Sequence, residues 1–428
     1  MVLTSDPLLA AGSGFPKGGT AMNTMAPTRY FNSHLTFDVI DTFAGFIAAE
    51  SAWKALQARD PEMTFFLSWD WLAQAFRNNP YRWSVIAIRD PKDNDRLLGL
   101  LPLKYRVHWS RSRQEFQSEI EAGGRLLFSE YTGFICDPEA ETAVLETMAQ
   151  ALRGMPWARM SLRYVAQQRR AEIFCGAFER FGYPVSWQDY RINNGETDNL
   201  ICPQVSLTGD FEHYLQTSIS ANTRQRHRRV QRRHFAKGAY HFTLSDADSF
   251  ERDLATLMRF WIHKWTPSKG ADTARDVASN FETMLRAALA ADALFLPILW
   301  RGDQPLAALG HVIDRGNGVM HFIIAGRDTT ANEAFIGNAL HFHSIEQAIA
   351  LGCASYDFGH GDEAYKFSYG AEKTKLQYFS IRRPELRRDN IFDSLGTGAA
   401  LRRIEGFISS GKTEQAARGC RQLSRLFR

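Results

Sequence analysis

Titratable side chains are crowded into one short stretch of the sequence, YDFGHGDEAYKFSYG, which spans residues 356–370. The stretch contains Asp357, His360, Asp362, Glu363, Tyr365 and Lys366. Carboxylates, phenols and amines are the groups that exchange protons with a reacting substrate. Glu363 and Lys366 are three residues apart, so on a short helix they share one face and converge on one ligand. A glycine-rich turn with a capping acid and a solvated ion pair is the plainer interpretation, and the spacing alone does not decide between the two.

The elements before this stretch predict where it lies in a sheet. A strand over 319–327 is followed by a helix ending near Leu351, which carries an apolar stripe and a capping box formed by Thr330 and Glu333, and then by a strand over 355–358. In open α/β sheets, ligands bind at the carboxyl ends of the strands. We therefore expect a site in the loop that follows Phe358.

Positive charge is concentrated in two segments. The first, SANTRQRHRRVQRRHFAKG, carries Arg224, Arg226, Arg228, Arg229, Arg232, Arg233 and Lys237 without an acid between them. Such a helix favours the phosphates of a cofactor or a tRNA, or anionic lipid headgroups, although a solvated basic face fits equally well. The second, TEQAARGCRQLSRLFR, predicts a basic amphipathic helix that either docks on the body of the protein or contacts a membrane surface.

The length of 428 residues predicts two domains rather than one. Both halves place a strand hairpin before a helix and a further strand, which indicates two related α/β units over 31–203 and 204–385, followed by a basic helical tail over 386–428. Residues 1–30 are rich in Gly, Pro, Ser and Thr and predict a disordered leader.

Composition and motifs exclude several classes of protein. The net charge of +4 does not favour DNA binding, and five cysteines without a CxxC pair argue for a reducing cytoplasm. The histidines lack metal-ligand spacing, so they are predicted to be structural, as is Asp357; these histidines are His311, His321, His341 and His343. There is no GxSxG elbow, Walker loop or dinucleotide fingerprint.

Four stretches in order carry a resemblance to a known family. They are FLSWDWL with LLGLLPL, then SEYTGFICDPE, then SISANTRQRHRRVQRR, and finally AIALGCASYDFGHGDEAYKFSYG. Over residues 64–385 the chain resembles the GNAT-like acetyltransferases first associated with cellulose biosynthesis, which are relatives of the Fem aminoacyltransferases. The resemblance implies a tandem pair of GNAT-like α/β folds, with mixed, splayed sheets flanked by helices. It also implies acyl transfer from a thioester, usually acyl-CoA, to an amine or a hydroxyl, without a metal.

The resemblance also assigns roles to residues. The pantetheine of acyl-CoA is expected between strands 319–327 and 355–358, with its phosphates near Gly337, Asn338, Arg327, Arg228 and Arg232. Where the family has Ser-Pro-Gly, this chain has Phe-Ile-Gly and keeps the glycine. Glu363, with Asp362 as substitute, is expected to be the base or the anchor of the acceptor ammonium group. Tyr365 is expected to be the acid, and Lys366 to stabilise the oxyanion or bind phosphate.

The acceptor is left open by the sequence. Aromatic and basic segments favour a lipid amine such as a sphingoid base, which gives a ceramide-type amide at an anionic membrane surface on the inner, cytoplasmic side. Acetylation of an exopolysaccharide or envelope sugar is the first alternative. Fem-like transfer from aminoacyl-tRNA and a non-catalytic binder of anionic polymers are the others.

Overall fold

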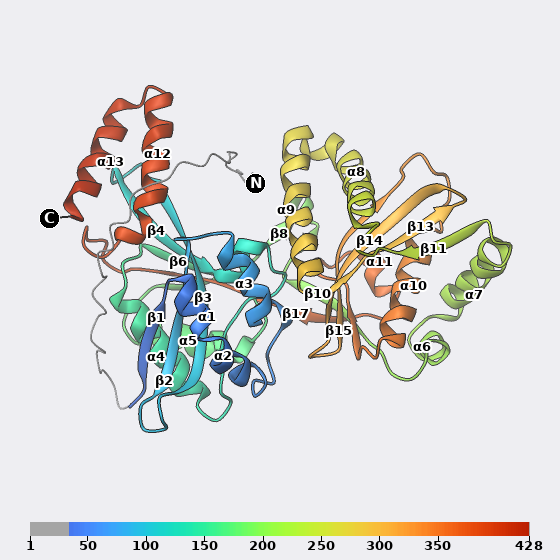
Figure 1. Ribbon diagram of the computed structural model, residues 1–428, viewed down its shortest axis with the longest axis horizontal. Coiled ribbons are helices and arrows are strands. Elements are labelled where there is room, and N and C mark those ends of the chain that lie inside the picture. Colours follow the sequence, from blue (N-terminus) through green and yellow to red (C-terminus); the bar gives the residue numbers. More distant parts are fainter. Residues whose placement is uncertain (1–33, 428) are drawn as a thin grey trace.

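The computed structural model describes residues 34–427, so the predicted leader over 1–30 lies outside the described residues. Two eight-stranded mixed sheets lie side by side (Figure 1). We call them the first and the second sheet, and the units built around them the first and the second unit. The predicted α/β class with two related units is confirmed.

The two sheets have the same order of strands. The first runs β1 (Thr36–Ile40), β2 (Trp83–Asp90), β3 (Arg96–Ser110), β4 (Glu115–Ala122), β6 (Arg159–Val165), β18 (Gln377–Arg382) and β7 (Val185–Trp187), with β5 (Ile135–Cys136) beside β3. The second runs β11 (Tyr240–Leu244), β13 (Pro297–Arg301), β14 (Gln304–Asp314), β15 (Val319–Arg327), β16 (Ser355–Asp357), β10 (Ile201–Ser206) and β17 (Glu372–Lys375), with β12 (Leu294–Phe295) beside β14. In each, the fourth and fifth strands form the parallel pair.

The units exchange strands across the predicted boundary near residue 203. β10 follows the first unit in the chain but pairs with β16 and β17, whereas β18 follows the second unit but pairs with β6 and β7. A short two-stranded sheet, β8 (Arg191–Ile192) with β9 (Thr197–Asp198), lies before β10. This arrangement ties the units together, because the first sheet is completed by β18 from the far end of the second unit.

Helices cover both faces of each sheet. One set of helices from each unit faces the other unit, and these two sets pack together in one shared core. The first unit has α1 (Phe43–Ala48), α2 (Glu50–Gln57) and α3 (Trp69–Arg77) on one face, and α4 (Glu141–Gly154) and α5 (Gln168–Glu179) on the other. The second has α8 (Phe250–Lys269) and α9 (Ala271–Ala290) on one face, and α6 (Phe211–Thr217), α7 (Ala221–Val230) and α10 (Ile336–Ala350) on the other. One cluster of buried side chains contains Trp71 of α3 together with Leu257 of α8 and Leu285 of α9.

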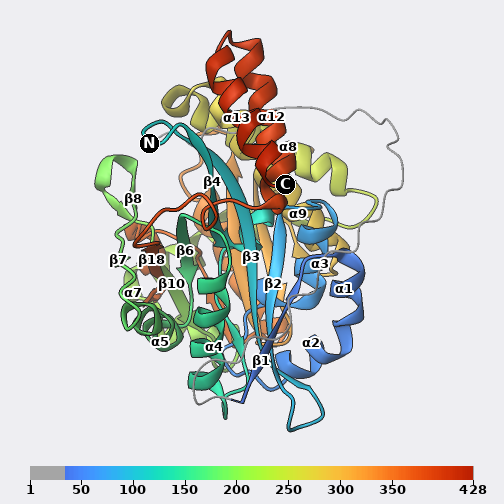
Figure 2. The same ribbon diagram turned by 90° about the vertical axis from the view of Figure 1, so that its left-hand side faces the viewer.

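The C-terminal segment folds into η5 (Ser394–Gly396), α12 (Thr397–Ser409) and α13 (Thr413–Arg425) and docks against the first sheet beside β4 (Figure 2). Phe407 packs on Trp109 and Phe116, and the side chain of Gln422 bonds to the backbone of Phe116 at 2.6 and 2.9 Å. The amphipathic pattern of α13 thus covers an apolar part of the first unit. Within residues 34–427, no helix is both long and apolar enough to cross a membrane.

Candidate functional site

The parallel strands β15 and β16 separate after three pairs. Val319, Met320 and His321 pair with Ser355, Tyr356 and Asp357, after which β16 ends while β15 continues to Arg327. A β-bulge stands at this point, because Gly310 pairs with Ile324 while His311 pairs with Phe322. Such bulges bend a strand away from its neighbour. The second half of β15 is therefore free of a pairing strand on this side among the described residues.

The turn after β16 is shaped by two glycines and closed by a lysine. Gly359 has φ of 64°, and a Cβ there would lie 2.8 Å from the carbonyl oxygen of Phe322. Lys366 is 3% exposed; its ammonium group donates to the carbonyls of His360 (2.6 Å) and Gly361 (3.0 Å) and forms an ion pair with Glu363 at 3.0 Å. Two of the three donors of the ammonium group therefore hold the turn.

The other predicted catalytic side chains lie around the short helix α11 (Ala364–Phe367). Asp362 accepts a hydrogen bond from the backbone N–H of Asp198 at 2.8 Å. Glu363 is the N-cap of α11 and remains partly exposed. Tyr365 is 45% exposed, with its ring centroid 6.0 Å from that of His341 on α10. Surrounding protein and the charge of Glu363 raise the pKa of Tyr365, so its hydroxyl keeps its proton.

The helix α10, which follows β15, begins without a side-chain cap. Its N-cap is Phe335, so the predicted capping box is wrong. Glu333 instead bonds to Tyr240 and Arg301, and Thr330 bonds to Asp328. The first N–H groups of a helix have no partner inside it and attract anions.

The residues predicted to hold the cofactor lie on this helix and on its neighbours. A Cβ at Gly337 would have no atom within 4 Å, and Asn338 accepts a hydrogen bond from Tyr369 at 2.8 Å. Arg327 ends β15 and is exposed.

The basic segment lies along α10. His227 packs on Phe342, with ring centroids 4.4 Å apart, and His234 stacks on Phe335 at 4.2 Å. His227 is on α7 and His234 is on the π-helical turn that follows it, η4 (Gln231–Phe235). Arg228 pairs with Glu212, and Arg232 is exposed. The structure thus brings a cationic helix to the helix start that was predicted to bind phosphate.

The sequence analysis missed a buried cluster at the junction of the two units. Asp357 is fully buried and accepts hydrogen bonds from the Tyr131 hydroxyl (2.6 Å), His321 Nδ1 (2.7 Å) and the Gly359 N–H (2.8 Å). Burial favours protonation of this carboxyl, but the bonds from His321, Tyr131 and Gly359 prevail and lower the pKa of Asp357. The signal was present, since His321 and Asp357 stand at the same level of the predicted strand pair and Tyr131 is in the quoted stretch SEYTGFICDPE.

A second contact between the units involves His360. Its Nδ1 lies 2.9 Å from the Glu130 carboxylate and its Nε2 lies 2.7 Å from the Glu130 carbonyl, so both ring nitrogens face acceptors. Burial disfavours the charged carboxylate, but the neighbouring His360 prevails and lowers the pKa of Glu130. The ring also stacks on Tyr164 at 3.8 Å.

Two further histidines form a buried chain on the α10 side of the sheet. The Tyr356 hydroxyl lies 2.9 Å from His311 Nε2 and 3.1 Å from His341 Nδ1, and His311 Nδ1 lies 3.1 Å from the carbonyl of Phe295. Burial lowers the pKa of both histidines to about 3, so both rings are neutral. Within the described chain, no group of three His, Cys, Asp or Glu residues could hold a metal ion.

A groove of about 660 Å³ runs along α8. It is lined by Ala255, Met258, Arg259, Ile262, His263, Thr266 and Pro267. Lys264, within the same part of α8, has its pKa lowered by burial and by Arg327, and Glu363 opposes that shift.

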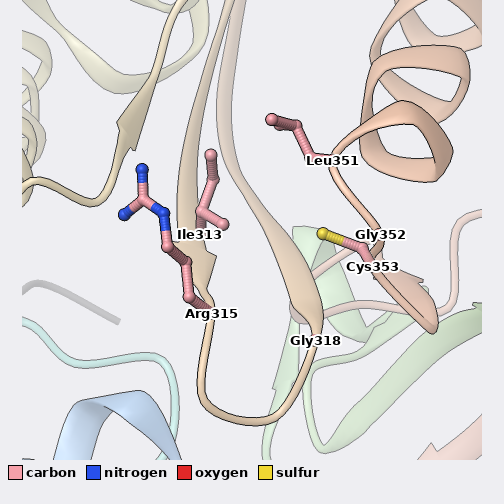
Figure 3. A pocket seen from close by; sticks show the side chains of 6 residues that line it. All are labelled: Ile313, Arg315, Gly318, Leu351, Gly352 and Cys353. Atoms are coloured by element: carbon pink, nitrogen blue, oxygen red, sulfur yellow. The ribbon is translucent and has the colours of Figure 1, made fainter.

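A smaller pocket of about 140 Å³ lies at the other end of the strand pair. It is lined by Ile313, Arg315, Gly318, Leu351, Gly352 and Cys353 (Figure 3). Gly318 and Cys353 precede β15 and β16, so this pocket is remote from the point where the strands separate.

Comparison with known proteins defines the class. Residues 221–367 match the family described as Acetyltransferase (GNAT) domain. FemX is similar in structure, with 12% sequence identity and a TM-score of 0.52 over 77% of this chain and 95% of that one. A tandem GNAT protein from the clavulanic acid biosynthesis pathway is similar at 8% identity, with a TM-score of 0.46 over 82% and 99% of the two chains. L-PGS from Bacillus licheniformis is similar at 13% identity, with a TM-score of 0.40 over 68% and 82%. No curated protein matches the chain significantly.

The second unit therefore contains a GNAT acetyltransferase domain, and the protein is an acyltransferase. The expected tandem GNAT-like fold is confirmed, because the first sheet repeats the strand order of the second and the FemX fold spans most of the chain. The narrower resemblance to the cellulose-associated acetyltransferases stays a prediction.

Proposed function

We propose that the protein is an acyl-CoA-dependent N-acyltransferase whose donor binds in the second unit. The observation that carries this proposal is the separation of β15 from β16, together with the uncapped start of α10, the next helix after β15. A pantetheine arm would lie along the unpaired half of β15. Its pyrophosphate would meet the N–H groups of Gly337 and Asn338, with Arg327, Arg228 and Arg232 offsetting the phosphate charge.

The side chains around α11 suit the departure of a thiolate. The Tyr365 hydroxyl keeps its proton at neutral pH and the residue is 45% exposed, so we assign it as the acid that protonates sulfur. Glu363 would anchor the ammonium group of the acceptor. Asp362 and Lys366 are engaged with backbone groups, which supports a role in holding the loop rather than direct contact with the thioester.

The groove along α8 supports a lipid amine, such as a sphingoid base, as acceptor. Met258, Ile262 and Ala255 provide apolar surface on which an aliphatic chain could lie. The product would be an amide of the ceramide type. Such work would take place in the cytoplasm, at the inner face of the membrane.

Purified protein should be incubated with acetyl-, octanoyl- and palmitoyl-CoA, each with sphinganine, glucosamine or no acceptor. We expect free thiol to appear only with an amine, fastest with sphinganine, and the amide to be seen by mass spectrometry. Tyr365→Phe should lower kcat by about 10²-fold, whereas Tyr81→Phe, at an exposed position outside this site, should match the wild type. Absence of amine-dependent thiol release with every pair would refute the proposal.

A further inference from the structure

We propose that His321 is the general base that takes the proton from the acceptor amine, oriented by Asp357 and by Tyr131 of the first unit. The inference rests on the proposed function and assigns a residue that neither the sequence motif nor the α11 cluster contains.

The first argument is the protonation pattern of the ring. His321 Nδ1 lies 2.7 Å from Asp357 Oδ2, a carboxylate that can only accept, so the proton of the neutral ring is on Nδ1. Nε2 therefore presents a lone pair. This atom is buried and has no hydrogen-bond partner among the described residues.

The second argument is that a buried, unpaired nitrogen is costly. Nearly all buried polar atoms in folded proteins have a partner, so an orphan lone pair requires an explanation. Asp357 is fully committed to three donors, which fixes the ring while leaving Nε2 free. An N–H or N–H⁺ group of the acceptor would provide the partner that Nε2 lacks.

The third argument is position. His321 and Asp357 form the last pair of the register before the parallel strands separate. The His321 ring faces the first unit, with centroids 5.2 Å from Phe66 and 5.5 Å from Tyr131. Tyr365 lies on the opposite side, near His341 of α10. A thioester held between the strands would thus have a base on one face and an acid on the other.

The step balances without any further reactant. His321 Nε2 takes a proton from the ammonium form of the acceptor, and the lone pair that this frees attacks the thioester carbon and forms the C–N bond. The electron pair of the C–S bond leaves on sulfur, which takes the proton of Tyr365, and the phenolate regains a proton from the nitrogen. The imidazolium then loses its proton to solvent, so the net products are an amide, free coenzyme A and one proton.

The test uses the full chain and the acyl-CoA and amine pair that gives the fastest thiol release. His321→Gln should lower kcat by about 10²- to 10⁴-fold while the Kd for acyl-CoA stays within about threefold of the wild type. The loss should be much smaller with hydroxylamine as acceptor, because that nucleophile is already unprotonated at neutral pH. A structural role would lower the rates with both acceptors equally. His343→Gln, which removes a histidine stacked on Phe242 away from the cluster, should behave as the wild type.

The outcomes separate the two proposals. A wild type that is inactive with every pair refutes the proposed function, whatever the state of His321. An active wild type with a folded His321→Gln variant of near-normal kcat overturns the inference. If that variant does not fold, Asp357→Asn decides, because it keeps the shape of the site but removes the negative charge and replaces one of the two acceptor oxygens with a donor. A folded Asp357→Asn enzyme with unchanged kcat overturns the inference, and a reduced kcat that is again milder with hydroxylamine supports it.

Discussion

The two units place the same parallel strand pair in different surroundings. In the first unit, β4 pairs with β6 through Glu119, Ile120 and Glu121. After β4 ends, the chain returns to the edge of β6 with which β4 no longer pairs. Thr132 forms a parallel bridge with Val165 of β6, and β5 pairs with β3. In the second unit, the described chain provides no such return beside the end of β15. One gap is filled with backbone, and the other has no pairing strand among the described residues.

The helices that follow the fourth strand of each sheet, α4 and α10, differ in the charge at their first turn. The first turn of α4 carries Glu141, a buried carboxylate that pairs with Arg170 and Arg169, and Arg170 also pairs with Asp60. The first turn of α10 has no acidic residue and lies beside a cationic helix. An anion would be repelled from the first helix start and attracted to the second.

The comparison shows that the first unit contributes side chains that contact the candidate site of the second unit. The segment that fills its own gap begins at Glu130 and Tyr131, and these two residues reach His360 and Asp357 across the junction. A duplicated fold has thus become one scaffold and one candidate catalytic unit. The following changes test that division, beginning with the largest expected effect.

The buried ion cluster of the first unit, formed by Arg170, Asp60 and Glu141, should contribute to stability and not to catalysis. Arg170→Met leaves Asp60 and Glu141 without their buried partner, so the free energy of unfolding should fall by about 3–5 kcal/mol. Denaturant titration measures the loss, and the kcat of the folded fraction should stay near that of the wild type. Arg169→Met removes an exposed arginine that also pairs with Glu141 and should cost less than about 1 kcal/mol. Equal losses in the two variants would contradict the buried role of Arg170.

The contribution of the junction between the tail and the first unit to stability should depend on pH. Burial raises the pKa of Asp393 to about 6, above its ordinary value near 4. The folded state therefore binds more protons than the unfolded state between these values, and stability should fall as pH rises from about 4 to about 6. Asp393→Asn should remove this slope and stabilise the protein by roughly 1–3 kcal/mol at pH 7.5. Urea unfolding at pH 4.5 and 7.5 checks this; parallel curves for the two proteins would contradict it.

Local patterns in the sequence predicted much of this architecture. Apolar periodicity predicted the helix that ends near Leu351 and the strands on either side of it, and the order of elements predicted two related units. The start of α10 was missed because Thr330 and Glu333 match a capping box in type and spacing, whereas tertiary partners claim both side chains.

Contacts between distant parts of the chain explain the rest. The exchange of β10 and β18 depends on which sheet has a free edge, which no local pattern records. The bond between Tyr131 and Asp357 joins residues 226 positions apart. The motif predicted that Lys366 would stabilise the oxyanion or bind phosphate. In the structure its ammonium group binds two carbonyls of the turn, which reach it only because Gly359 and Gly361 bend the chain.

Giving α10 the acidic start of α4 should make the second unit resemble the first. Gly337→Glu places a carboxylate in the first turn, where a side chain has open space, and should raise the Kd for coenzyme A about 10- to 30-fold. Isothermal titration measures the change. Gly337→Ala adds a methyl group without charge and should bind as the wild type, so an equal loss in both variants would point to backbone shape rather than charge.

The cationic helix beside α10 should contribute the smallest and most salt-dependent share of donor binding. Arg228 and Arg232 are exposed, so water and ions screen their attraction for phosphate. Changing both to Gln should raise the Kd for coenzyme A only about three- to fivefold at low salt, and the difference should shrink at about 0.5 M salt. Arg421→Gln with Arg425→Gln removes the same charge from the tail on the first unit and should leave the Kd unchanged at both salt concentrations. An equal loss of affinity in the two double variants would contradict the division between the units. It would mean that the overall charge of the protein, rather than a built site, attracts the donor.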